Sequence, residues 1–104
     1  MTTFYMLCGF PGSGKSYWAR EKAKSYDVIV SSDFIRKELY GDASIQEDPG
    51  RVFNIMFQRT CAALKTGNTV YYDATNINAK RRINLLKSLK RLFPDIHYYC
   101  VVIA

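Results

Sequence analysis

One segment constrains the fold of this chain more than any other: residues 9–16 read Gly-Phe-Pro-Gly-Ser-Gly-Lys-Ser. They match the phosphate-binding pattern G-x-x-x-x-G-K-[ST] at every fixed position. An apolar, β-prone run over residues 3–8 precedes the segment, and a helix-like stretch over residues 16–25 follows it. In that setting, successive backbone N–H groups and the positive end of the helix point at an anion. The sequence therefore predicts a nucleoside triphosphate site.

The residues that we expect to bind ATP and its Mg²⁺ lie in this loop and directly after it. Lys15 is expected to reach the β- and γ-phosphates, and the Ser16 hydroxyl to hold Mg²⁺. The predicted nucleotide-binding set is Gly9, Pro11, Gly12, Ser13, Gly14, Lys15, Ser16 and Tyr17. The alternative interpretation is a glycine-rich turn before an ordinary helix.

Composition places the chain among globular proteins and gives no sign of a membrane segment. Its 104 residues suit a single domain over 1–104, and 48% of them are hydrophobic while 23% are charged. No apolar run approaches the ~20 residues of a membrane-spanning helix, and the start of the chain lacks the layout of a signal peptide. Three cysteines sit in apolar runs without metal-ligand spacing, which favours a reducing compartment. We expect a cytoplasmic protein that does not enter the membrane.

The net charge of +6 suggests a polyanionic partner. Much of the positive charge gathers between residues 80 and 91, within one predicted helix. The alternative is a solvated helix face with no partner. Beside a phosphate site, a basic balance favours nucleic acid.

Strand and helix patterns alternate along the chain. Strands are expected over residues 3–8, 26–30, 69–73 and 96–104, and helices over residues 16–25, 32–40, 49–66 and 79–93. In the last helix, the predicted inward side chains are Ile83, Leu86, Leu89 and Phe93. Such alternation predicts a parallel sheet with helices on both faces. The predicted fold is a P-loop NTPase-type three-layer α/β/α sandwich with about four strands.

Two acidic residues follow predicted strands at the edge where such sheets bind ligands. Asp33 falls in the first turn of a helix after the second strand, and Arg36 lies three residues later on the same helix face. We interpret Asp33 as the base that accepts the proton of an acceptor hydroxyl, and Arg36 as a group that binds an anionic acceptor. The alternatives are a dipole-stabilising helix charge for Asp33 and a surface charge for Arg36.

Asp73 ends the third predicted strand. It is a candidate for the Mg²⁺ shell, for orienting Arg36, or for merely beginning a turn. In the loop that follows, Thr75, Asn76 and Asn78 could bind substrate or build Asx-type turns.

Together these residues carry a family resemblance that covers residues 4–103. The string Gly-x-Pro-Gly-Ser-Gly-Lys-Ser-x-Trp-Ala-Arg-Glu over 9–21, Asp33-x-x-Arg36, and Asp-Ala-Thr-Asn-Ile-Asn-x-x-Arg-Arg over 73–82 resemble the kinase domain of bacteriophage 5′-polynucleotide kinases. The resemblance implies that Asp33 is the general base on a 5′-hydroxyl and that Arg36 contacts the 3′-phosphate of the substrate. It also implies that Lys15 and Ser16 serve ATP and its metal, and that Asp73 supports the acceptor site. Zeta-toxin-like and other small-molecule kinases share much of this pattern.

The chain departs from the family in two ways. Tyr17 replaces the threonine usual after the P-loop serine. Family members also continue into a lid helix with an arginine over the transferring phosphate and then into a further strand. We therefore expect a C-terminally truncated kinase core, and loss of such an arginine predicts slower transfer by about 10³ to 10⁵. A non-catalytic ATP-binding module is the alternative. The uncharged run over residues 97–103 predicts an edge strand through which the chain forms a homodimer.

Overall fold

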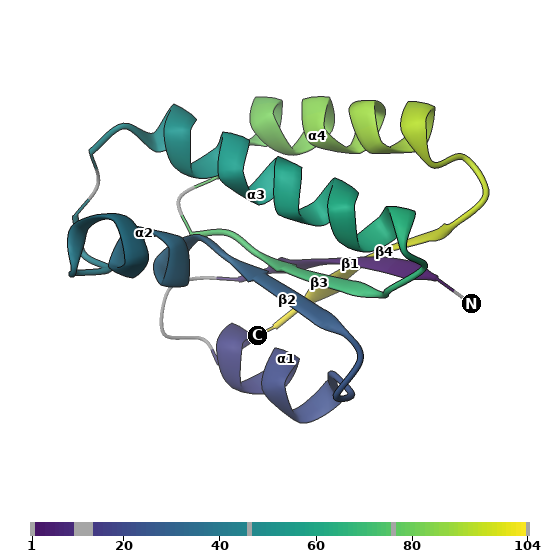
Figure 1. Ribbon diagram of the computed structural model, residues 1–104, viewed down its shortest axis with the longest axis horizontal. Coiled ribbons are helices and arrows are strands. Elements are labelled where there is room, and N and C mark those ends of the chain that lie inside the picture. Colours follow the sequence, from purple (N-terminus) through teal and green to yellow (C-terminus); the bar gives the residue numbers. More distant parts are fainter. Residues whose placement is uncertain (1, 10–13, 46, 76, 104) are drawn as a thin grey trace.

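Four parallel strands form the centre of the protein in a computed structural model, which describes residues 2–9, 14–45, 47–75 and 77–103. Helices connect the strands along the chain (Figure 1). The elements are β1 (Thr3–Cys8), α1 (Lys15–Lys22), β2 (Val28–Ser31), α2 (Ser32–Tyr40), α3 (Pro49–Lys65), β3 (Val70–Asp73), α4 (Ala79–Leu92) and β4 (His97–Val102).

The order of the strands in the sheet is β2-β3-β1-β4, and every neighbouring pair is parallel. At the carboxyl end of β3, Asp73 is in register with Leu7 of β1 on one side and with Ser31 of β2 on the other. The segments that leave these three strands therefore begin side by side. This is the edge at which parallel α/β sheets bind their ligands.

Helices cover both faces of the sheet, as predicted (Figure 1). α3 and α4 lie on one face, and α1 lies on the other. The main core is on the α3–α4 face, and its fully buried members include Phe4, Val30, Val52, Met56, Val70 and Leu89. The buried cluster on the α1 face is smaller and consists of Leu7, Ala19 and Tyr71. The predicted α/β fold with a parallel sheet is confirmed.

Helix ends follow from local chemistry. The Ser31 hydroxyl accepts a hydrogen bond from the backbone N–H of Phe34 and so caps α2, which ends at Gly41 in a left-handed conformation (φ 77°). Pro49 opens α3 behind Asp48, whose side chain accepts from Arg51 N–H. These caps fix where α2 and α3 stand relative to the carboxyl edge of the sheet.

One inward assignment in α4 is wrong: Ile83 is 52% exposed. Leu85 and Leu86 pack on the core with the fully buried Leu89 instead. At 3.6 residues per turn, Ile83 lies about 200° around the helix from Leu85 and therefore points away from the sheet.

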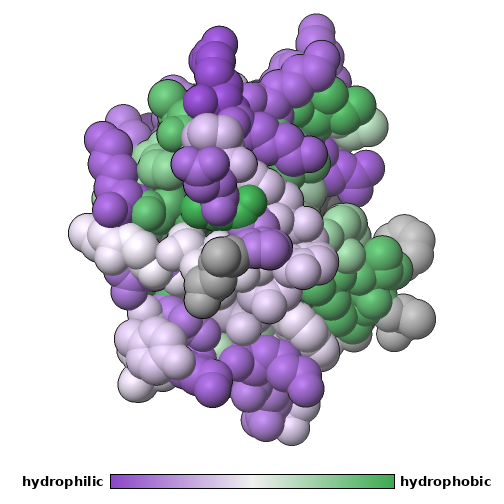
Figure 2. Space-filling model, turned by 90° about the vertical axis from the view of Figure 1, so that its right-hand side faces the viewer, coloured by the Kyte–Doolittle hydropathy of each residue, from purple (hydrophilic) through white to green (hydrophobic). Residues whose placement is uncertain are grey.

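β4 forms one edge of the sheet, as predicted. Tyr99 and Val102 on this strand are 54% and 75% exposed, and Figure 2 shows hydrophobic side chains gathered on the flank where β4 lies. Within the described ranges, none of the helices combines the length and the apolar character that crossing a membrane requires.

Candidate active site

Lys15, Ser16 and Asp73 form a polar cluster between the start of α1 and the end of β3. The Lys15 Nζ lies 3.5 Å from Asp73 Oδ1, and the Ser16 hydroxyl donates to Asp73 Oδ2 over 2.7 Å. Lys15 and Asp73 are 5% and 4% exposed. A buried charge is destabilising unless it is paired, and the carboxylate of Asp73 is the partner that stabilises the buried Lys15 ammonium.

The backbone leads into this cluster through Gly14, which has φ 93° and precedes the first residue of α1. A side chain at this φ is strained, so glycine suits the position. No side chain caps α1 in the described residues, and its first backbone N–H groups therefore remain available to an anion. Geometry and charge at this end of α1 fit a phosphate group.

A second cluster joins α2 to the loop after β3 through Thr75. The Thr75 hydroxyl donates to Asp33 Oδ1 over 3.1 Å, and the Thr75 N–H donates to the Ser32 hydroxyl over 2.9 Å. The two hydroxyl oxygens of Ser32 and Thr75 are 3.1 Å apart. Since Thr75 has one hydroxyl proton and gives it to Asp33, the Ser32 hydroxyl must donate to Thr75. This network holds one oxygen of the half-buried Asp33 in place.

Arg36 is only 1% exposed, so its interpretation as a plain surface charge is wrong. Its Nη1 donates to the Thr75 hydroxyl over a long 3.5 Å, and its Nε has no hydrogen-bond partner among the described residues. Among the described residues, no carboxylate lies within ion-pair distance of this guanidinium. A buried guanidinium without an anion nearby fits a position that an anionic ligand completes.

Seven of the predicted site residues line one cavity of about 300 Å³: Gly14, Lys15, Ser16, Tyr17, Asp33, Asp73 and Thr75. Arg36 is not among the residues that line it. Tyr17, the unusual residue beside Ser16, is 65% exposed there. Gly9 follows β1 at the same edge, whereas Pro11, Gly12, Ser13 and Asn76 lie outside the described residues.

Comparison with known proteins identifies the family of this chain. The sequence model of the AAA domain family matches residues 4–103. The chain belongs to this family. Its AAA domain is of the P-loop kinase-like type. No curated protein matches the sequence.

Solved structures with a similar fold include two chains from complexes of several proteins. A chain of the "Pnkp1/Rnl/Hen1 complex" matches 99% of this chain with a TM-score of 0.75 and 26% identity. A chain of the "Pnkp1/Rnl/Hen1 RNA repair complex" matches 98% of it with a TM-score of 0.74 and 24% identity. The AAA domain described here spans 35% and 33% of the lengths of those chains.

The donor set of the AAA domain also fits Mg²⁺. Ser16 and Asp73 supply a hydroxyl and a carboxylate oxygen, and Asp73 Oδ1 has only its 3.5 Å ion pair with Lys15 and no hydrogen-bond partner among the described residues. Oxygen ligands suit Mg²⁺, which usually keeps waters and takes further ligands from substrate phosphates. Within the described ranges, no cluster of three or more His, Cys, Asp or Glu residues could hold a metal alone. A site shared with a nucleotide is therefore the arrangement that these residues fit.

Two residues of the site have roles that sequence patterns leave open. Ser32, the first residue of α2, is fully buried, and its hydroxyl accepts a hydrogen bond from the backbone N–H of Thr75. The sequence signal for this contact is the Ser31–Ser32 pair, because one hydroxyl caps the helix and the other can form a hydrogen bond elsewhere. Asn78 caps α4 by accepting a hydrogen bond from Arg81 N–H over 2.8 Å, so its side chain makes a local contact with the backbone.

Proposed function

We propose that this chain transfers the γ-phosphoryl group of ATP to a hydroxyl group, and that the acceptor is the 5′-hydroxyl of a nucleic acid. One observation carries the proposal. Asp33 and the buried Arg36 both contact Thr75, two residues after Asp73, which contacts Lys15 and Ser16. A carboxylate, an unpaired cation and a phosphate-binding helix end meet at one strand edge, and these are the parts that phosphoryl transfer needs.

On the ATP side, Lys15 and the first N–H groups of α1 bind and orient the phosphates. Ser16 and Asp73 would hold Mg²⁺, which when bound neutralises charge on the phosphate oxygens. Asp73 keeps both Lys15 and Ser16 pointed at the same place through its two oxygens. The residues of α1 therefore act by positioning and charge rather than by forming bonds.

On the acceptor side, Asp33 takes the proton. Asp33 Oδ1 accepts a hydrogen bond from the Thr75 hydroxyl, whereas Asp33 Oδ2 makes no hydrogen bond to any described residue. The acceptor hydroxyl gives its proton to Asp33 Oδ2 as its own oxygen bonds to the γ-phosphorus, while the bond from that phosphorus to the bridging oxygen breaks and ADP leaves. Arg36 binds an anionic group of the acceptor, which the family resemblance implies to be a 3′-phosphate.

Charge and similarity support a nucleic acid acceptor over a small molecule. The chain carries a net charge of +6, and one similar structure is described as an RNA repair complex. Pairing of a second copy along β4 and a cytoplasmic location remain proposals beside this one.

The test is transfer of labelled γ-phosphate from ATP and Mg²⁺ to a 5′-OH oligonucleotide, with Lys15→Ala, Asp33→Asn and Asp95→Asn compared. Asp33→Asn should lower the rate by about 10² to 10⁴, because the amide cannot accept the proton. Lys15→Ala should lower it by about 10² to 10³ through loss of charge stabilisation. Asp95, an exposed residue between α4 and β4, is the matched control, and its variant should keep full activity.

The outcomes separate the three candidate functions. Transfer to a small polyol or sugar but not to any oligonucleotide would favour a small-molecule kinase. ATP binding that depends on Lys15, without transfer to any hydroxyl, would favour a binding module. Transfer that survives Asp33→Asn unchanged would overturn the role of Asp33 as the base.

A further inference from the structure

A second cavity, of about 260 Å³, lies between α3 and α4, apart from the one that contains Lys15 and Asp33. Aromatic and aliphatic side chains form much of its wall, with amides and a hydroxyl around them. Its lining includes Phe53, Phe57, Tyr72, Ile77, Arg81 and Asn84. An apolar cavity with a few polar groups is the usual form of a site for a small ring system, and this one lies just below the ~300 Å³ typical of small-molecule sites.

Two of the residues that line this cavity, Phe53 and Arg81, form a cation–π pair. The Arg81 guanidinium carbon lies 4.8 Å from the centre of the Phe53 ring. Phe53 comes from α3 and Arg81 from the first turns of α4, so the stacked pair bridges the two helices. Aromatic rings and guanidinium planes are the surfaces on which proteins stack unpaired nucleobases.

Tyr72 supplies an independent sign of a ligand. It is 2% exposed, it lines the cavity, and its hydroxyl makes no hydrogen bond to any described residue. Burial raises the pKa of this hydroxyl, so it remains protonated and can donate. A ring nitrogen or carbonyl of a ligand in the cavity could accept a hydrogen bond from this hydroxyl.

Charge around the cavity favours a polyanion as the carrier of that ring. No acidic residue lines the cavity, and none lies in the first turn of α4. Lys80 and Arg82 flank Arg81 there, at the end of α4 where the helix dipole also attracts negative charge. Phosphates on either side of a bound base would therefore meet positive charge.

The cavity adjoins the candidate active site through β3 and the loop after it. Tyr72 lines the cavity while its neighbour Asp73 lines the active site, and Ile77 follows Thr75 by two residues. Adjacent residues of a strand point to opposite faces, so the two sites lie on opposite sides of one strand end. A strand whose 5′ end lies at Asp33 has this cavity nearby.

We propose that the α3–α4 cavity binds one unpaired nucleobase of the acceptor strand, which stacks with the Phe53–Arg81 pair and accepts a hydrogen bond from Tyr72. The proposal rests on the proposed function, because it takes the acceptor to be a nucleic acid. It adds a base-binding site that requires the acceptor to be single-stranded at one position near its 5′ end.

The experiment uses short single-stranded 5′-OH oligonucleotides in which 2-aminopurine replaces the base at one position after another. Stacking quenches 2-aminopurine fluorescence, so the wild type should quench it strongly at one position. Phe53→Leu should weaken oligonucleotide binding by about 5- to 150-fold, the range for loss of one base–aromatic stack. Tyr72→Phe should weaken it about three- to tenfold, as for loss of one neutral hydrogen bond.

Tyr99→Phe is the matched control, since it removes a hydroxyl from an exposed tyrosine on β4. It should leave quenching and affinity unchanged. Tyr72→Phe should keep the thermal stability of the wild type, because the hydroxyl that it removes makes no hydrogen bond to any described residue. An oligonucleotide that lacks the base at the quenched position should bind wild type and Phe53→Leu equally.

Failure of this inference differs from failure of the proposed function. Phosphoryl transfer that persists with no position-dependent quenching, and with equal affinity for wild type and Phe53→Leu, would overturn the base site and leave the kinase assignment standing. ATP binding without any oligonucleotide binding or transfer would overturn both.

Discussion

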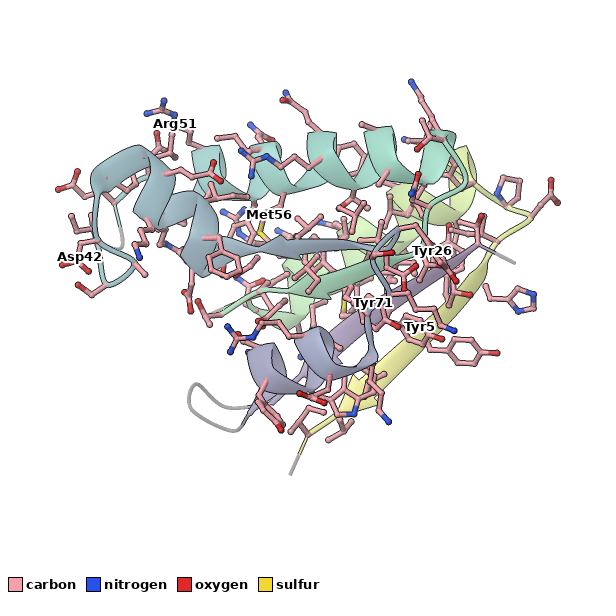
Figure 3. The ribbon with its side chains drawn as sticks, turned by 60° about the horizontal axis from the view of Figure 1, so that its bottom comes forward. Tyr5, Tyr26, Asp42, Arg51, Met56 and Tyr71 are labelled. Carbon is pink, nitrogen blue, oxygen red and sulfur yellow. The ribbon has the colours of Figure 1, made fainter. Side chains whose placement is uncertain are left out.

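The sheet is tightly covered on its α3–α4 face and thinly covered on its α1 face. On the first, Met56 points from α3 toward the strands and is fully buried (Figure 3). On the second, Tyr5 stacks on Tyr71 with ring centres 4.8 Å apart and on Tyr99 with centres 5.8 Å apart, yet Tyr99 is 54% exposed. Tyr71 packs against Trp18 of α1, so the stack of tyrosines leads from the part of the sheet that α1 covers to the exposed Tyr99 on β4.

This difference separates stability from chemistry. Lys15 and Ser16 belong to α1, and the side chain that joins them, Asp73, points to the α1 side of the sheet. Arg36 and Lys15 are buried polar groups at the carboxyl edge, where apolar packing gives way to charge. We therefore expect substitutions on the α3–α4 face to change stability most, and substitutions at the carboxyl edge to change activity most.

The largest expected effect on stability comes from Met56→Ala. Truncation of this fully buried side chain should lower the free energy of unfolding by about 2–5 kcal/mol, because it removes apolar contacts and leaves a cavity. Urea unfolding followed by far-UV circular dichroism measures the change. ATP affinity should stay the same at temperatures where the variant is folded.

Tyr99→Ala, on the thinly covered α1 face, is the counterpart of Met56→Ala. Its side chain is already half in solvent, so the loss should stay below about 1 kcal/mol. Equal losses for Met56→Ala and Tyr99→Ala would mean that the two faces contribute alike, contrary to the comparison.

The next substitution should increase the free energy of unfolding rather than lower it. Arg36→Met should raise the free energy of unfolding by about 1–4 kcal/mol, since it replaces a buried charge without an ion-pair partner by an apolar side chain of similar length. The same variant should lose the preference for a nucleoside 3′-phosphate over the unphosphorylated nucleoside as acceptor. Thermal unfolding and a phosphoryl-transfer assay with both acceptors measure the two changes.

Lys37→Met is the matched control, because Lys37 follows Arg36 in α2 but is exposed. It should change neither stability nor acceptor preference appreciably. A fall in stability for Arg36→Met would show that the guanidinium is well compensated in the folded protein and is not waiting for an anion.

Much of the fold was predictable because its signals are local. The P-loop pattern, the Ser31 cap, Gly41 and Pro49 each act through neighbouring residues. The end of α1 was placed at residue 25 but lies at Lys22. No glycine or proline marks that end. A turn there is closed by Lys24 N–H donating to Asp27 Oδ2 over 2.9 Å, and it also delays the start of β2 to Val28.

The site was predictable as a set of residues but not as a network. Asp73 contacts Lys15 and Ser16 because β3 lies beside β1 and the Asp73 side chain points to the α1 side of the sheet, and both are tertiary properties. The burial of Arg36 likewise depends on how α2 packs on its neighbours. Similarly, the cavity beside Phe53 and Arg81 exists only because α3 and α4 lie next to each other.

The smallest expected effect is on the reactivity of a cysteine in β4, the edge strand beside β1. Cys100 is exposed at this edge, but its Sγ lies 2.7 Å from that of Cys8. Burial of the sulfur, together with the hydrogen bond and the charge of Cys8, raises the pKa of Cys100 to about 11. Because the thiolate is the reactive form, alkylation by iodoacetamide should be slow at neutral pH and should accelerate with pH until about pH 11.

Cys8→Ala sharpens this last prediction. Without the neighbouring sulfur, the hydrogen bond and the charge that raise the Cys100 pKa disappear, and alkylation at neutral pH should become faster. Peptide mapping by mass spectrometry after timed alkylation distinguishes Cys100 from Cys61, whose pKa burial also raises. If the rate at Cys100 instead levels off near pH 8.5, the ordinary value for a free thiol, then solvent dominates its environment. In that case β4 would be open to solvent, and β1 would be the last strand that is shielded on this side of the sheet.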